Sequence, residues 1–154
     1  MTDARRRATE APPPQAIREI IRRAGHEIRN ALNGVAVNVE VVRSRSGGAS
    51  ETSAGELTPF AERAMIQVGE ASALTDGLLA LVNSVLAAQA AGTLKSPAGH
   101  GAGSRIELMI YGDAAPGLMS DIERLASRVG VGVEQHGQRV ILTILPEGKS
   151  HSKD

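Results

Sequence analysis

The chain of 154 residues contains no cysteine and no tryptophan, and Phe60 and Tyr111 are the single members of their residue types. Without cysteine, disulfides, thiolate metal sites and thiol nucleophiles are excluded. With so few aromatic rings, a stacking surface for single-stranded nucleic acid is not expected. An excess of positive charge is also missing, because 17 Lys and Arg residues balance 17 Asp and Glu residues. We therefore expect no nucleic-acid partner.

Long apolar runs are missing as well. No uninterrupted stretch approaches the ~18–20 residues that cross a bilayer. Residues 1–14, which combine Arg5, Arg6 and Arg7 with three prolines, lack the apolar core of a signal peptide. We therefore expect a cytoplasmic protein without membrane insertion, whose first 14 residues form a disordered arm.

The first periodic segment runs from Gln15 to about Arg45. Its apolar residues recur at intervals of three and four, which is the spacing of one helical face. These apolar positions are Ile17, Ile20, Ile21, Ala24, Ile28, Ala31, Leu32, Val35, Val39 and Val42. The small, polar stretch at 46–55 follows and indicates a hairpin loop.

A second helix is predicted from Thr58, as its N-cap, and Pro59, as its first helical residue, to about Ala91. Residues 15–91 would then form a long antiparallel helical hairpin. Two helices alone leave part of their apolar surface uncovered. We therefore expect the hairpin of a second copy to complete a dimeric four-helix bundle.

After a linker at 92–104, the apolar pattern changes from helical to alternating. Residues 105–146 predict a small β-α-β-β unit, and a polar tail occupies 147–154. The strands are expected at Arg105–Tyr111, Val131–Gln135 and Arg139–Leu145, and the helix at Leu118–Val129. The expected fold class is α+β, in which the small unit follows the helical hairpin.

One group of reactive side chains lies on the first predicted helix. His26 and Asn30 are four residues apart and share a helical face, and Glu27 flanks the same patch. A neutral imidazole nitrogen can accept a phosphoryl group, and a carboxylate can orient the ring or take its proton. An amide can hold a phosphoryl oxygen or an attacking water. Phosphoryl transfer depends chiefly on such positioning, to which Arg29 could add a cation at the edge of the patch.

The segment His26-Glu-Ile-Arg-Asn-Ala-Leu32 resembles the phosphoacceptor motif in the dimerisation and histidine-phosphotransfer domain of bacterial sensor histidine kinases. The resemblance covers residues 15–91. It implies that His26 is the phosphoacceptor and that Glu27 is its acid/base partner. It also implies that Asn30 positions water when a phosphorylated regulator is dephosphorylated. Ala31 stands where that family commonly has a proline that bends the helix.

In that family an ATPase domain follows, in which asparagines on one helix hold magnesium and glycine-rich loops surround the nucleotide. Here every Asn, at positions 30, 33, 38 and 83, precedes the linker. A unit the size of residues 105–146 is also too small to enclose a nucleotide. We interpret it as a degenerate or replaced ATPase domain, so the protein would not phosphorylate itself from ATP.

The sequence thus predicts a histidine phosphotransfer protein of a two-component phosphorelay. His26 would exchange a phosphoryl group with the aspartates of response-regulator receiver domains, and the receiver would supply Mg²⁺. We expect no metal or cofactor of the protein's own. The docking surface would surround His26 and include Arg29, Ala31, Asn33 and Gly34. The small residues among them would allow a partner to approach closely.

Two alternatives stay open at this point. The protein could be a phosphatase or phosphate sink for one regulator, since Glu27 and Asn30 serve that reaction as well. It could also be a non-catalytic dimerisation module in which Glu27 merely pairs with Arg23 on the helix surface. The other three histidines are expected in the linker, in a turn and in the tail, without metal-ligand spacing.

Overall fold

The computed structural model of the protein describes residues 14–46, 54–95, 105–110 and 117–145. In these residues the fold is α+β, and its elements follow in the order α2, α3, β1, α4, β2 and β3. The strands form one antiparallel sheet. Residues 1–13 of the predicted arm at 1–14 and the predicted tail at 147–154 lie outside the described residues, as do His100 and His151.

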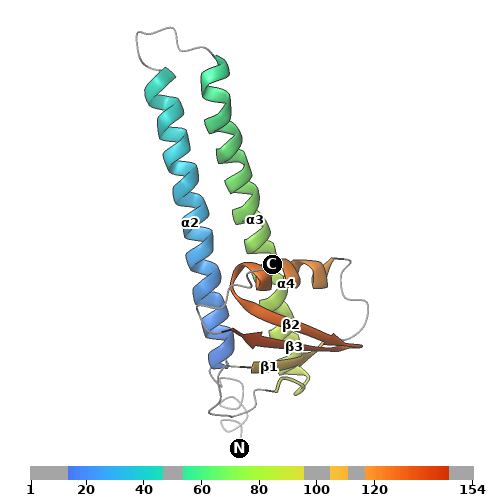
Figure 1. Ribbon diagram of the computed structural model, residues 1–154. Coiled ribbons are helices and arrows are strands. Elements are labelled where there is room, and N and C mark those ends of the chain that lie inside the picture. Colours follow the sequence, from blue (N-terminus) through green and yellow to red (C-terminus); the bar gives the residue numbers. More distant parts are fainter. Residues whose placement is uncertain (1–13, 47–53, 96–104, 111–116, 146–154) are drawn as a thin grey trace, which may run out of the picture.

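Two long helices, α2 at Gln15–Ser46 and α3 at Ala54–Ala90, lie side by side and form the long axis of the molecule (Figure 1). Near the start of α2 they bury branched side chains, including those of Ile17, Ile20 and Leu81. The three–four spacing of the apolar residues is what places these side chains on one stripe of each helix.

The start of α3 differs from the prediction. The helix begins at Ala54, four residues before Thr58, and Pro59 lies inside it. Pro59 has no N–H for the carbonyl of Gly55, so one hydrogen bond of the first turn is lost. A proline costs less at this position than in mid-helix because few helical bonds precede it. The expectation that Pro59 opens the helix was therefore wrong by about one turn.

The sheet has the strand order β1-β3-β2. The strands span Arg105–Met109 for β1, Val131–His136 for β2 and Arg139–Ile144 for β3. In the central strand, Leu142 lies opposite Ile106 of β1 and Val133 of β2. Gly137, with φ of 63°, supplies the left-handed conformation that the tight turn between β2 and β3 requires.

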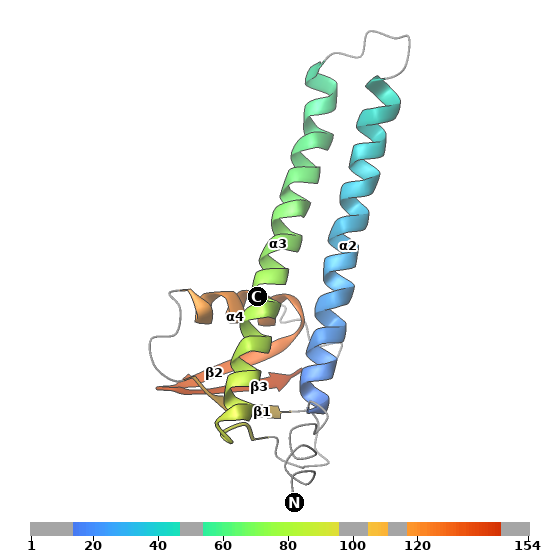
Figure 2. The ribbon, with the colours of Figure 1, turned by 180° about the vertical axis from the view of Figure 1, so that it is seen from behind.

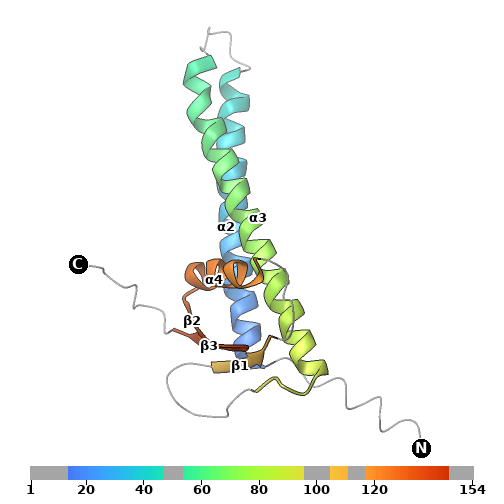
Figure 3. The same ribbon diagram turned by 90° about the vertical axis from the view of Figure 1, so that its right-hand side faces the viewer.

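Helix α4, Leu118–Arg128, lies with the sheet on one face of the hairpin (Figures 1 and 3). Its buried residues Ile122 and Leu125 belong to the same apolar core as Leu142 of the sheet. Gly77 of α3 lets α4 approach, because a Cβ at this position would lie 2.6 Å from the backbone oxygen of Asp121. The small unit is therefore packed onto the hairpin by a shared core.

The opposite face of the hairpin carries neither α4 nor the sheet (Figure 2). Several large apolar side chains of the two helices remain exposed in the described chain. They are Ile21, Leu32, Val37 and Val39 on α2, and Met65, Ile66, Val68, Leu79 and Leu86 on α3. Their number indicates that part of the hairpin surface is suited to contact with another molecule.

Helix α3 is also long and apolar enough, over Gly55–Ala90, to meet the length and composition of a membrane span. A third of its most apolar window is buried inside the protein. A helix that packs against its neighbours in a core meets the same criterion. The expectation of no membrane insertion therefore stays a prediction.

Candidate functional site

His26 lies in the N-terminal half of α2, on a part of the helix surface that is open to solvent. Its side chain is 61% exposed. Asn30 lies one turn further along the helix, and its amide nitrogen Nδ2 is 3.0 Å from His26 Nδ1. The four-residue separation predicted from the sequence accounts for this contact, since such residues are neighbours on a helix.

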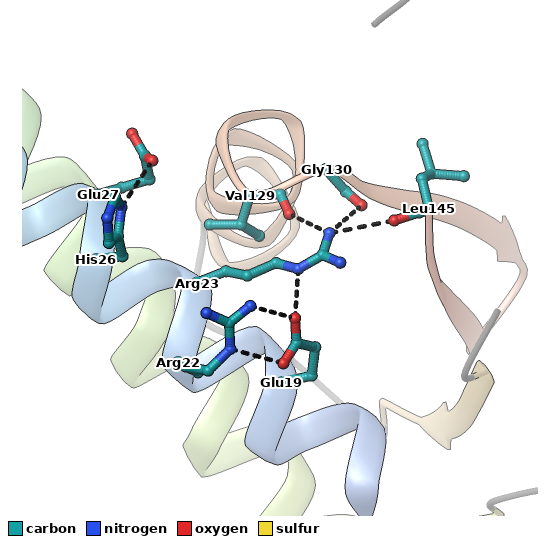
Figure 4. Close-up of polar contacts among 8 residues, drawn as sticks. All are labelled: Glu19, Arg22, Arg23, His26, Glu27, Val129, Gly130 and Leu145. Atoms are coloured by element: carbon teal, nitrogen blue, oxygen red, sulfur yellow. Dashed lines mark hydrogen bonds and ion pairs between the residues drawn. The ribbon is translucent and has the colours of Figure 1, made fainter. Parts of the chain in front are cut away.

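Glu27 lies near the same ring nitrogen. Its carboxylate oxygen Oε1 lies 3.6 Å from His26 Nδ1, and its side chain is 44% exposed (Figure 4). Both contacts of the imidazole are thus made at Nδ1. Neither Glu27 nor Asn30 occupies Nε2, so this nitrogen is the one available to an incoming group.

Arg23 does not form the surface ion pair with Glu27 that the sequence analysis considered. Its Nε donates to Glu19 at 2.8 Å, and its Nη1 donates to the carbonyl oxygens of Val129, Gly130 and Leu145 (Figure 4). The local pattern allowed either carboxylate as partner. Contact with the small unit favours Glu19, because the guanidinium must extend toward the end of α4.

Among the acidic residues of the described chain, Glu19 has the most strongly shifted pKa. Hydrogen bonds from Arg22 and Arg23 lower the pKa of its carboxyl group from 4.5 to about 2. Arg22 donates from both Nε and Nη2, at 2.8 and 2.7 Å, and Arg23 donates from Nε. Glu19 therefore stays ionised and holds Arg23 in place against α4.

The four residues predicted to surround the docking site have different positions. Arg29 and Asn33 are exposed, whereas Ala31 and Gly34 are half-buried. Gly34 lies beneath the side chain of Gln67 on α3. Its small size thus serves the contact between the two helices, and its part in docking stays a prediction.

Sequence reasoning considered Arg23 only as a partner of Glu27, and it missed the contacts by which two residues hold the helix of His26. One is Arg23, whose partners are backbone oxygens more than a hundred residues away. The other is Asn38, whose amide donates to Gly34 O at 3.0 Å and to Gln67 Oε1 at 2.9 Å. A polar residue within an apolar stripe was the available signal for Asn38. For Arg23 the sequence contains no local signal.

In the described part of the chain, no group of three or more His, Asp or Glu side chains could hold a metal ion. Comparison with protein-family models finds no match, and neither curated proteins nor solved structures give one. The assignment of function therefore depends on the chemistry of the site and on the resemblance carried by residues 26–32.

Proposed function

We propose that the protein is a histidine phosphotransfer protein, with His26 as the residue that carries the phosphoryl group. One observation carries this proposal: the exposed imidazole has its Nδ1 beside Asn30 and Glu27, which leaves Nε2 directed to neither. A carboxylate at Nδ1 can hold a proton there, and the electron pair of Nε2 is then free to attack.

The transfer reaction needs little beyond this arrangement. Nε2 attacks the phosphorus of an aspartyl phosphate on a receiver domain, and a new N–P bond forms. The P–O bond to the aspartate breaks, and its electron pair stays on the aspartate carboxylate. The proton on Nδ1 remains there and pairs with Glu27, which stabilises the positive charge that develops on the ring. Transfer to a second receiver reverses these steps.

The chain's own residues supply no nucleotide chemistry in this proposal. In its described residues the small unit contains a three-stranded sheet and one helix, and the sequence has no Asn after residue 83 that could hold magnesium beside a nucleotide. The phosphoryl group would therefore come from a phosphorylated receiver. The receiver would bind the Mg²⁺ that neutralises charge on the phosphoryl oxygens.

We also propose that two copies pair through the open face of the hairpin. Arg23 contacts the end of α4 and Gly77 contacts α4 itself, so both mark the covered side. Because a helix turns by about 100° per residue, Ile21 and Leu32 lie about half a turn from Arg23. Leu79 lies about half a turn from Gly77 by the same count. By this count, most of the large exposed apolar residues of both helices lie on the face of the hairpin opposite α4.

The residues on this face follow the alternating three–four spacing of a helical bundle seam. On α2 they are Leu32, Val35, Val39 and Val42, and on α3 they are Met65, Val68, Ser72, Thr75, Leu79, Val82 and Leu86. The two hydroxyl residues are small, so they allow close approach within a seam that is otherwise apolar. A second copy presents the same seam, and pairing about a twofold axis would bury both. His26 lies about 60° from Arg23 and so away from the seam, and pairing would leave it accessible to a receiver.

A phosphatase role is the second candidate, and Asn30 is the observation that favours it. An amide one turn from the phosphoryl-carrying nitrogen can orient a water molecule toward an aspartyl phosphate in a docked receiver. The two roles separate on substitution. His26→Ala should abolish the appearance of label on the protein, whereas Asn30→Ala should slow the loss of phosphate from the receiver. A protein in which neither variant changes either reaction would contradict both roles and favour a structural dimerisation module.

A further inference from the structure

Two side chains compete for one nitrogen of His26. Asn30 Nδ2 is 3.0 Å from Nδ1, and Glu27 Oε1 is 3.6 Å from the same atom. The two side chains require opposite protonation of that atom. An amide nitrogen can only donate, so it needs an Nδ1 without a proton. An ionised carboxylate can only accept, so it needs an Nδ1 that carries one.

The protonation of Nδ1 decides the reactivity of Nε2. A neutral imidazole has one N–H, and its other nitrogen carries the available electron pair. When Asn30 donates to Nδ1, the proton is on Nε2, which then has no free pair. When Nδ1–H donates to Glu27, the pair on Nε2 is free. The observed distances favour Asn30, because 3.0 Å is within hydrogen-bond range and 3.6 Å is beyond it.

We propose that Asn30 holds resting His26 in the non-nucleophilic tautomer, and that Nε2 becomes reactive when the hydrogen-bond partner of Nδ1 changes from Asn30 to Glu27. This inference rests on the proposed function and assigns Asn30 as a positioning residue for the transfer step. In the exchange, Nε2 gives a proton to water and Nδ1 takes one from water. The composition and charge of the ring are unchanged. His26, Glu27 and Asn30 are all reached by solvent, so water can carry the proton.

The substrate itself can release the ring. A phosphoryl group docked in front of Nε2 presents oxygens that accept hydrogen bonds more strongly than a neutral imidazole does. The Asn30 amide would turn its N–H toward them, and Nδ1 would be left to Glu27. His26 would thus become nucleophilic only with a phosphorylated partner in place, which protects it from reaction with small phosphate donors.

The tautomer can be measured directly by NMR on the full-length protein labelled with ¹⁵N-histidine. Long-range ¹H–¹⁵N correlations distinguish the protonated from the unprotonated ring nitrogen, at an alkaline pH where the ring is neutral. The His26→Gln variant identifies the resonances of His26 among those of the four histidines. We expect the Nε2–H form to dominate in the wild type and the Nδ1–H form to dominate in Asn30→Asp, which offers only acceptors. Asn83→Asp, an exposed site on α3, adds the same charge and should leave the wild-type pattern unchanged.

Reactivity gives a second readout that does not involve a receiver. Phosphoramidate transfers its phosphoryl group to an imidazole nitrogen: the P–N bond breaks, and the leaving amine takes a proton from water and departs as ammonia. Asn30→Ala should raise the initial rate of His26 phosphorylation by about two- to tenfold, the factor expected when one modest hydrogen bond no longer favours the unreactive form. Asn83→Ala should react at the wild-type rate.

The results separate this inference from the proposed function. A wild-type ring in the Nδ1–H form, or an Asn30→Ala variant that reacts no faster than wild type, would overturn the role of Asn30. Label transfer from a receiver to His26 would still stand in that case. Conversely, the expected tautomers and rates together with no transfer from any bound receiver would overturn the proposed function and leave the control of the ring by Asn30 in place. Signal dispersion in the same spectra shows that each variant is folded.

Discussion

The guanidinium of Arg23 donates through Nη1 to the backbone carbonyl of Val129 at 3.2 Å, across 106 positions of sequence. The same nitrogen reaches Gly130 O at 3.4 Å and Leu145 O at 3.2 Å. The oxygens of Val129 and Gly130 lie at the C-terminal end of α4, where a cation also interacts favourably with the helix dipole. The small C-terminal unit is therefore fastened to α2 one turn before His26 (Figure 4).

Replacement of Arg23 by Met should destabilise the protein by about 2 kcal/mol, because three carbonyl oxygens and the Glu19 carboxylate lose a donor. Urea denaturation measures the change. Arg22→Met is the matched control, because the Arg22 side chain is 60% exposed and its pair with Glu19 lies on the surface. The control should lose no more than about 0.5 kcal/mol. Equal losses for the two variants would show that the contact with α4 does not hold the unit in place.

The carboxylate of Glu19 gives the fold a dependence on acid. Its pKa is lowered from 4.5 to about 2 by hydrogen bonds from Arg22 and Arg23. Its contribution to stability is therefore complete above pH 4.5 and is lost as the pH falls toward 2. Glu19→Gln should be less stable than wild type by about 1 kcal/mol at neutral pH, and the difference should shrink over that acid range. The comparison is made by thermal unfolding at several pH values.

A pH-independent difference between wild type and Glu19→Gln would contradict the ion pairs as its cause. Glu40→Gln provides the control, since Glu40 pairs with Arg43 on the same helix in a more exposed position. That variant should change stability by only a few tenths of a kcal/mol.

Two glycines of α3 should respond to alanine in opposite directions. A Cβ at Gly77 would lie 2.6 Å from Asp121 O and 2.8 Å from Leu125 Cβ, so α4 would have to move. Gly77→Ala should cost about 1–3 kcal/mol. At Gly69 no atom lies within 4 Å of the added carbon, and Gly69→Ala should stabilise the helix by about 0.5–1 kcal/mol. Stabilisation by both substitutions in denaturation experiments would contradict the close packing of α4 on α3.

The proposed dimer makes a prediction about neighbouring valines of α2. Val39 is 52% exposed and lies in the seam, whereas Val37 is 64% exposed and lies outside it. Val39→Glu should shift the protein from dimer to monomer in sedimentation equilibrium, because it would bury a charge. Val37→Glu should remain dimeric. A wild-type monomer, or equal behaviour of the two variants, would contradict pairing through this face.

The periodic parts of the fold could be predicted from the sequence, because regular spacing reflects burial along one face. The helix over 15–46 follows its three–four pattern almost to the residue. The start of α3 could not be located in this way, since Thr58 and Pro59 form a good start signal whether or not a helical turn precedes them. Local signals indicate which conformations a residue permits, and contacts with the rest of the chain determine which conformation is adopted.

The candidate site shows the same division. The contact between His26 and Asn30 follows from their spacing on one helix. The partners of Arg23 do not, because they are backbone atoms brought close only by the packing of α4 and β3. The use of Gly34 was also missed, since the approach of Gln67 depends on how the two helices are aligned.

The most direct test of the proposed function is transfer of label from a receiver domain. A response regulator that binds the protein is phosphorylated on its aspartate with ³²P, separated from its donor, and mixed with wild type, His26→Ala or His136→Ala. We predict acid-labile label on wild type and on His136→Ala, none on His26→Ala, and none on any of the three after incubation with labelled ATP alone. Label on His26→Ala equal to that on wild type, or no transfer from the bound regulator, would contradict the assignment of His26 as the phosphoryl carrier.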